Sequence, residues 1–166
     1  MKTLLIIRHA KSSWGQPTTP DIDRPLNDRG KKDAPAMAGR LLEAGIRIDR
    51  FVSSPARRAR HTAELFARVF GVKDNNIVII TDLYHALPNV FQQVIAGLDD
   101  EDDTVALFSH NPGITAFVNT LASTRLDNMP TCSVFAVKGS AAKWSEFLSA
   151  KPEFLFFDYP KSETAD

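Results

Sequence analysis

The sequence contains a single cysteine, Cys132, which excludes an internal disulfide framework and a cysteine-rich metal site. No apolar run approaches the roughly 20 residues that a membrane-spanning helix needs. The N-terminal apolar stretch is also too short for a signal sequence, because Arg8 ends it. We therefore expect a cytoplasmic protein in which Cys132 is a buried, unreactive thiol.

Neither sign of charge is in excess, since 20 Lys and Arg residues balance 20 Asp and Glu residues. The chain therefore has no overall field that would attract nucleic acid or a membrane, and we expect neither as a partner. Any site for an anion must be built locally. The 166 residues, 43% of them hydrophobic, fit one globular domain over residues 1–160, followed by a polar tail over residues 161–166.

Short apolar runs alternate with helical patterns, which predicts an α/β fold with a mostly parallel sheet. The predicted strands are Thr3–Ile7, Arg50–Ser53, Ile77–Ile80, Thr104–Phe108, Cys132–Val137 and Glu153–Asp158. The predicted helices are Asp28–Ala44, Pro55–Phe70, Pro88–Gly97 and Ile114–Ala122. The stretch Trp14–Arg24 has the composition of a loop.

Two of the four histidines lie where predicted strands end. Arg8 and His9 follow the first strand, and His110 follows the strand Thr104–Phe108 and Ser109. Either histidine alone would be explained by a turn or by packing. Because ligands of open α/β sheets bind beyond the carboxyl ends of the strands, we expect both imidazoles to reach one crevice.

The helix that follows Ser54 and Pro55 carries several arginines. Ser54 is a good N-cap residue, and proline suits the first helical position. At roughly 100° per residue, Arg58 lies about 70° from the centre of the apolar face, whereas Arg57 and Arg60 point well away from it. Arg58 is therefore predicted to lean over the sheet edge into the crevice, and the other two arginines to face solvent.

Histidines and arginines that converge on one crevice suit a phosphoryl group. The planar guanidinium group matches the spacing of phosphate oxygens and often binds them with two hydrogen bonds. Histidine is the group in such a pocket that can attack phosphorus, and covalent capture divides a difficult displacement into two easier steps. The surrounding positive charge should lower the pKa of the histidine and keep a lone pair free at neutral pH.

Four motifs resemble, in the same order, those of the histidine phosphatase superfamily, and specifically its SixA-like phosphohistidine phosphatase branch. They are Arg8-His9-Ala10 after a strand, Arg24-Pro25-Leu26 followed by Gly30, Ser54–Ala63 with Arg58 before Ala59, and Ser109-His110-Asn111-Pro112. Together they span residues 4 to about 120, which is most of the chain. Arg-His-Ala alone is a weak signal, but the ordered set is specific.

The resemblance implies a three-layer αβα sandwich like that of phosphoglycerate mutase, with no metal and no organic cofactor. It also implies that His9 is the nucleophile, that Arg8, Arg58 and His110 bind the phosphate, and that Arg24 assists them. The chain is short beside the mutases, with little room for the insertions that close over phosphoglycerate. Hydrolysis is therefore expected in preference to mutation.

One departure from the resemblance concerns the proton donor. Many relatives supply a carboxylic acid near the leaving group, roughly where this chain has Tyr84-His85. His85 could donate the proton, Asp21 or Asp23 on the loop could serve, or the substrate could need little help. A phosphohistidine suits the last alternative, because its leaving nitrogen is readily protonated, whereas a phosphate monoester needs a positioned acid worth about 10²–10⁴-fold.

We therefore expect a metal-independent phosphohydrolase that forms a phosphohistidine on His9. A phosphohistidine side chain of a partner protein is the preferred substrate, and small phosphorylated metabolites are the alternative. A non-catalytic phosphate-recognition module is a third possibility. Such a module would need the arginines but would not need an imidazole that can attack phosphorus.

Overall fold

The computed structural model describes residues 1–121, 123 and 125–163. Within these residues, six strands form one sheet in the order β3-β2-β4-β1-β5-β6. Their bounds are β1 Lys2–Arg8, β2 Arg50–Ser53, β3 Val78–Ile79, β4 Thr104–Ser109, β5 Val134–Gly139 and β6 Glu153–Asp158. Strands β1 to β4 are parallel, whereas β5 pairs antiparallel with both β1 and β6. The predicted mostly parallel sheet is confirmed.

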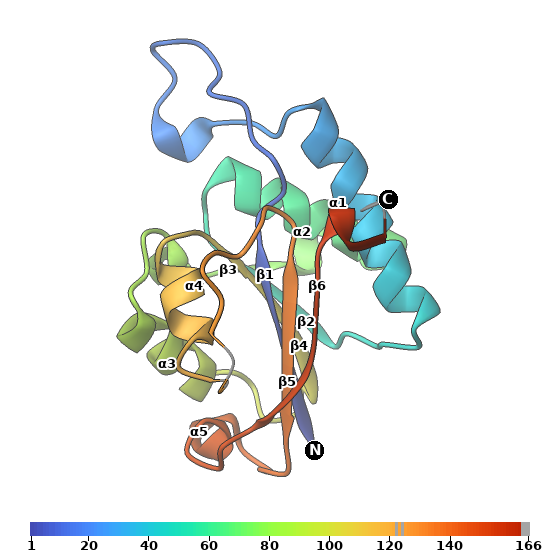
Figure 1. Ribbon diagram of the computed structural model, residues 1–166, viewed down its shortest axis with the longest axis vertical. Helices are drawn as coiled ribbons and strands as arrows, with labels where there is room; N and C mark the ends of the chain where they lie inside the picture. The colour runs from blue at the N-terminus through green and yellow to red at the C-terminus, as the bar shows by residue number, and fades with distance from the viewer. Residues whose placement is uncertain (122, 124, 164–166) are drawn as a thin grey trace.

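Helices cover both faces of this sheet, as Figure 1 shows. The helices are α1 Asp28–Glu43, α2 Arg57–Val69, α3 Pro88–Ala96, α4 Gly113–Val118 and α5 Trp144–Phe147. Helices α1 and α2 lie on one face, and α3 and α4 lie on the other. The fold is therefore the predicted αβα sandwich. No helix in the described part of the chain is both long and apolar enough to cross a membrane.

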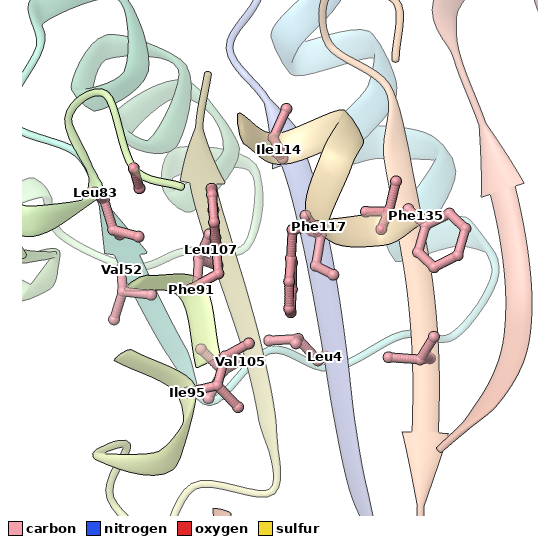
Figure 2. Packing of buried hydrophobic residues seen from close by; sticks show 14 of the residues in the cluster. Leu4, Val52, Leu83, Phe91, Ile95, Val105, Leu107, Ile114, Phe117 and Phe135 are labelled. Carbon is pink, nitrogen blue, oxygen red and sulfur yellow. The ribbon is translucent and has the colours of Figure 1, made fainter. Parts of the chain in front are cut away.

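The alternation of side chains along the central strand β1 creates two cores. Leu4 and Ile6 pack with α3 and α4, in the cluster drawn in Figure 2, whereas Leu5 and Ile7 pack toward α1 and α2. All four side chains are fully buried because β1 lies between β4 and β5 and is covered on both faces. Burial on both faces explains why this strand reads as an uninterrupted apolar run.

Helix α2 begins later than predicted, at Arg57 rather than Pro55. The N-cap position belongs to Ala56, so the assignment of Ser54 as the N-cap is wrong. The backbone N–H of Ser54 instead donates to the Phe108 carbonyl, which continues the pairing of β2 with β4. Ser54 therefore stays at the end of the sheet, where its hydroxyl is available to other side chains.

The fifth strand also begins later than predicted, at Val134 rather than Cys132. Cys132 has a φ of 62°, a left-handed conformation that a strand cannot contain. Its backbone N–H donates to the carbonyls of Arg8 and His9. This turn therefore supports the end of β1 instead of extending β5.

The remaining differences concern short or terminal elements. Strand β3 keeps two of its four predicted residues, and α5, with only four residues, was not predicted. Helix α4 ends at Val118, and Ala122 of the predicted helix lies outside the described residues. The predicted polar tail 161–166 begins inside the 3₁₀ helix η4 (Pro160–Glu163), and residues 164–166 lie outside the described residues.

The first turn of α1 is fastened to the loop that leaves β1, the blue segment that extends past the sheet in Figure 1. Asn27 caps the helix by accepting from the N–H of Gly30 at 2.9 Å, and its own N–H donates to the Lys11 carbonyl at 3.0 Å. Gly30 lies so close to this carbonyl that an added Cβ would overlap the oxygen. A glycine is therefore required where α1 meets the loop.

Replacing Gly30 with alanine should destabilise the protein by about 1–3 kcal/mol, because backbone must move to admit the methyl group. Gly39, in the same helix, has open space around its Cα, so Gly39→Ala should stabilise the protein by about 0.5–1 kcal/mol through helix propensity alone. Urea unfolding of both variants measures the two changes. A Gly30→Ala variant as stable as the wild-type protein, or more stable, would show that Gly30 is not held against the loop.

Candidate active site

A cavity of about 620 Å³ lies beyond the carboxyl ends of β1 and β4. Its lining includes five residues that the sequence singled out, namely Arg8, His9, Arg24, Arg58 and His110. Three of the four sequence motifs thus contribute from three different strand ends, and the Arg24 motif contributes from the loop before α1. The parallel arrangement of β1, β2 and β4 places these segments at one edge of the sheet.

His9 is buried, with 6% of its surface exposed. Its Nδ1 lies 2.8 Å from the carbonyl oxygen of Ala10. Because a carbonyl can only accept, Nδ1 must carry the hydrogen, which leaves the lone pair of the neutral ring on Nε2. The ring centroids of His9 and His110 are 5.2 Å apart, and their planes are inclined by 52°. The fold therefore presents a fixed imidazole with one free nitrogen.

Thr62 of helix α2 fixes the turn that contains His9. Its hydroxyl accepts from the N–H of Ala10 at 2.9 Å and donates to the Arg58 carbonyl at 2.7 Å. From the other side, the N–H of Cys132 holds the carbonyls of Arg8 and His9. Thr62 was not singled out in the sequence analysis. The available signal was a hydroxyl one turn after Arg58 in the same helix.

Burial keeps both cavity histidines uncharged. Burial, together with the charges of Arg8 and Arg58, lowers the pKa of His9 to about 3, although the hydrogen bond to Ala10 opposes the shift. Burial, with the neighbouring His9 and Arg58, lowers the pKa of His110 to about 2. The sequence predicted this direction from the guanidinium charge alone, whereas desolvation is the larger cause.

His110 follows β4 and bonds through Nε2 to the Ser54 hydroxyl at 2.7 Å. Its Nδ1 is buried without a hydrogen-bond partner among the described residues. The sequence identified Ser54 only as a helix cap, so its contact with His110 was missed. The contact depends on Ser54 remaining at the end of β2, which no local pattern reveals.

The three arginines reach the cavity from different elements. Arg58 is 5% exposed, whereas Arg57 and Arg60 are exposed, as the helical spacing predicted. Arg8 donates through Nη1 to the Met129 carbonyl at 2.8 Å, and its Nε is buried without a partner among the described residues. Arg24 lies at the rim, with its guanidinium 4.1 Å from the ring centre of Trp14. The cavity therefore combines buried and rim cations.

The three candidate proton donors, His85, Asp21 and Asp23, differ in their exposure and in their hydrogen-bond partners. His85 is exposed, has a φ of 58°, and packs its ring 4.0 Å from that of Tyr84. Asp23 is exposed on the 3₁₀ helix η1 (Asp21–Asp23). Asp21, at the start of the same helix, bonds to cavity arginines instead. The loop thus brings Asp21, and not Asp23, against the positive groups.

Asp21 accepts hydrogen bonds from Arg58 at 3.1 Å, from Arg24 at 3.1 Å and from the Tyr84 hydroxyl at 2.6 Å. Partial burial opposes ionisation, but the bonds from Tyr84 and the two arginines outweigh it and hold the pKa of Asp21 well below its usual range. Asp21 is therefore a carboxylate at neutral pH. The sequence named Asp21 as a loop acid but gave no sign of its partners.

The thiol of Cys132 is buried, and burial raises its pKa. An unreactive thiol was expected, and it is the backbone of this residue that supports the site. Across the described residues, no three His, Cys, Asp or Glu side chains gather as potential metal ligands.

Comparisons with known proteins identify similar sequences and structures. Residues 4–84 match the histidine phosphatase superfamily (branch 1). An uncharacterised protein of Mycobacterium leprae is 30% identical over 168 residues, which cover 93% of this chain and all of that protein. The crystal structure of a candidate phosphohistidine phosphatase SixA from Agrobacterium tumefaciens superposes with a TM-score of 0.81 and 27% identity, over 96% of this chain and 98% of the other.

The protein histidine phosphatase SixA complexed with tungstate shares the fold, with a TM-score of 0.79 and 21% identity over 95% of this chain and 97% of the other. The sequence motifs, the αβα fold and these comparisons all identify the same relatives. The chain is a phosphatase that belongs to the SixA-like branch of the histidine phosphatase superfamily.

Proposed function

We propose that this phosphatase hydrolyses phosphohistidine side chains of proteins through a phosphorylated His9. One observation carries the proposal: the neutral His9 ring is held by Ala10 so that Nε2 is free, inside a cavity lined by Arg8, Arg24 and Arg58. An imidazole with a free lone pair is the nucleophile that such a cavity needs. A pocket that only bound phosphate would not need it.

In the first step, Nε2 of His9 attacks phosphorus, and the electron pair of the P–N bond passes to the leaving nitrogen. Arg8, Arg58 and His110 bind the three phosphoryl oxygens and stabilise the charge that they carry in the transition state. In the second step, water attacks phosphorus, phosphate departs, and the neutral His9 ring returns. Arg24, at the rim, assists in attracting the dianion.

The rim of the cavity supports a macromolecular substrate. Trp14 lines the cavity beside Arg24, and 80% of its surface is exposed. An open rim admits a side chain that protrudes from another protein. His85 and Asp23, the acids suggested for an ester leaving group, are exposed to solvent, which favours a substrate whose leaving group needs little help.

Replacing His9 with alanine should lower kcat/KM by on the order of 10³-fold or more, because no other group can form the covalent intermediate. His61→Ala removes a half-buried histidine from α2 and should leave kcat/KM within about twofold. The assay uses a phosphohistidine-bearing protein and a chromogenic phosphate ester. Rapid quenching without acid should trap labelled phosphate on wild-type protein and not on His9→Ala.

A chelator should leave kcat/KM unchanged for both the phosphohistidine-bearing protein and the chromogenic ester, since guanidinium groups supply the positive charge in this mechanism. Turnover by His9→Ala, or the absence of turnover by wild-type protein on both substrates, would overturn the proposal. Loss of activity with chelator would indicate a metal-dependent reaction instead.

Two neighbouring arginines of α2 form a matched pair for a second test. Arg58→Ala should lower kcat/KM by about 10²–10³-fold, because it removes a buried donor from the phosphoryl oxygens. Arg57→Ala, which removes an exposed arginine from the same turn, should change kcat/KM by less than about threefold. If Arg57→Ala were the more damaging change, the assignment of Arg58 to phosphate would be wrong.

The neutral histidines also predict how stability depends on pH. The pKa values of His9 and His110 lie well below 6.5 in the folded protein, so the unfolded chain binds more protons between pH 6.5 and about 3. The free energy of unfolding should therefore fall as the pH drops below 6.5, by up to about 1.4 kcal/mol per pH unit for each histidine. Urea unfolding between pH 6.5 and 5 measures this slope. His9→Asn and His110→Asn should each reduce it, and an unchanged slope would contradict buried neutral imidazoles.

A further inference from the structure

The carboxylate of Asp21 has no part in the steps proposed so far, yet it bonds to two of the cavity arginines, Arg24 and Arg58. Its Oδ1 accepts from Arg24, and its Oδ2 accepts from Arg58 and from the Tyr84 hydroxyl. The Asp21 carbonyl also accepts from Nη1 of Arg58 at 2.8 Å. Despite these bonds, the side chain remains 42% exposed. A carboxylate so placed can still meet a ligand.

The carboxylate of Asp21 is joined to two residues that line the cavity, Arg24 and Arg58, and it is more exposed than Arg58. His9 is buried, so it attacks phosphorus from within the protein. In-line displacement expels the leaving group on the opposite side of phosphorus, which is toward solvent. Asp21 is the exposed member of the group formed with Arg58 and Tyr84, and the Tyr84 ring lies 5.7 Å from that of His110. A leaving group that departs toward solvent therefore passes the cavity arginines on whose exposed side this carboxylate is bonded.

The chemical state of Asp21 limits what it can do there. Bonds from Tyr84 and the two arginines keep it ionised, so it accepts protons or hydrogen bonds but has none to give. An ionised carboxylate is of no help to an alcohol leaving group, which needs a proton. It does stabilise a leaving group that already carries a positive charge.

We propose that Asp21 is a specificity-determining residue, which selects phosphohistidine by accepting a hydrogen bond from the protonated imidazole of the substrate. The inference rests on the proposed function and names the group that recognises the leaving side of the substrate. In the protonated substrate, one ring nitrogen is bonded to phosphorus and the other carries the proton that faces Asp21. Recognition thus requires a planar ring with a charged N–H opposite the phosphoryl group.

The displacement balances without any added proton. The new bond joins phosphorus to Nε2 of His9, and the electron pair of the broken P–N bond stays on the substrate ring. That ring leaves as neutral imidazole, since its other nitrogen keeps its hydrogen. The positive charge passes to the phosphorylated His9 ring, whose Nδ1–H remains bonded to Ala10. A phosphate monoester lacks this charge, so it gains nothing from Asp21.

The test compares Asp21→Asn with the wild-type protein on two substrates. One is a phosphoramidate, either phosphoimidazole or a phosphohistidine protein, and the other is a phenyl phosphate ester. Asparagine keeps an acceptor oxygen and the main-chain bond to Arg58 but removes the charge. We expect kcat/KM for the phosphoramidate to fall about tenfold, equivalent to about 1.4 kcal/mol, and kcat/KM for the ester to stay the same or rise. The basic limb of kcat for the phosphoramidate should also move to lower pH.

Asp82→Asn is the matched control, because it removes an exposed carboxylate from the 3₁₀ helix η3 (Thr81–Leu83) beside Tyr84. Asp82→Asn should leave unchanged the ratio of kcat/KM for the phosphoramidate to kcat/KM for the ester. Equal losses on both substrates in Asp21→Asn would mean that Asp21 only orients the arginines, and equal gains would mean that it competes with phosphate for them. Either outcome overturns the inference. Turnover of the phosphoramidate by His9→Ala would instead overturn the proposed function itself.

Discussion

The site depends on two imidazole rings that face each other while both remain uncharged. The ring centroids of His9 and His110 are 5.2 Å apart, beside Arg8 and Arg58. Two protonated rings there would repel each other and the arginines. Desolvation removes that cost by disfavouring the charged form of each ring. The same burial that permits the contact therefore also keeps a lone pair free on His9, the proposed nucleophile. Burial of the two rings therefore serves both the packing of the site and the proposed reaction.

The burial of these rings depends in turn on the central strand β1. β1 is covered on both faces, and its four apolar side chains alternate between two separate cores. The turn after β1 is also fixed in place, because Thr62 and the backbone of Cys132 form hydrogen bonds to it. A side chain at the end of such a strand loses little further freedom when it is fixed in place. Positioning a reactive group there is consistent with the general rule that precise sites are built on rigid elements.

Much of this arrangement could be predicted from the sequence. Arg50–Ser53 and Glu153–Asp158 form strands with the predicted bounds, and helical geometry alone separates the buried Arg58 from the exposed Arg57. These predictions succeed because they depend on local periodicity. The contact of His110 with Ser54 links residues 56 positions apart, and that of Asp21 with Tyr84 spans 63, so no local pattern encodes either. The left-handed turn at Cys132 was missed for a related reason, since its stability comes from distant carbonyls.

The hydroxyl of Thr62 joins the proposed nucleophile to the proposed phosphate-binding arginine through two consecutive hydrogen bonds. It connects the backbone after His9 with the backbone of Arg58, so a displacement of α2 along its axis would carry both groups in the same direction. The separation between His9 and the Arg58 guanidinium thus depends on how Thr62 connects the turn after β1 to α2. A small shift of α2 should therefore change the distance between His9 and Arg58 less than the distance from either residue to elements that Thr62 does not bond.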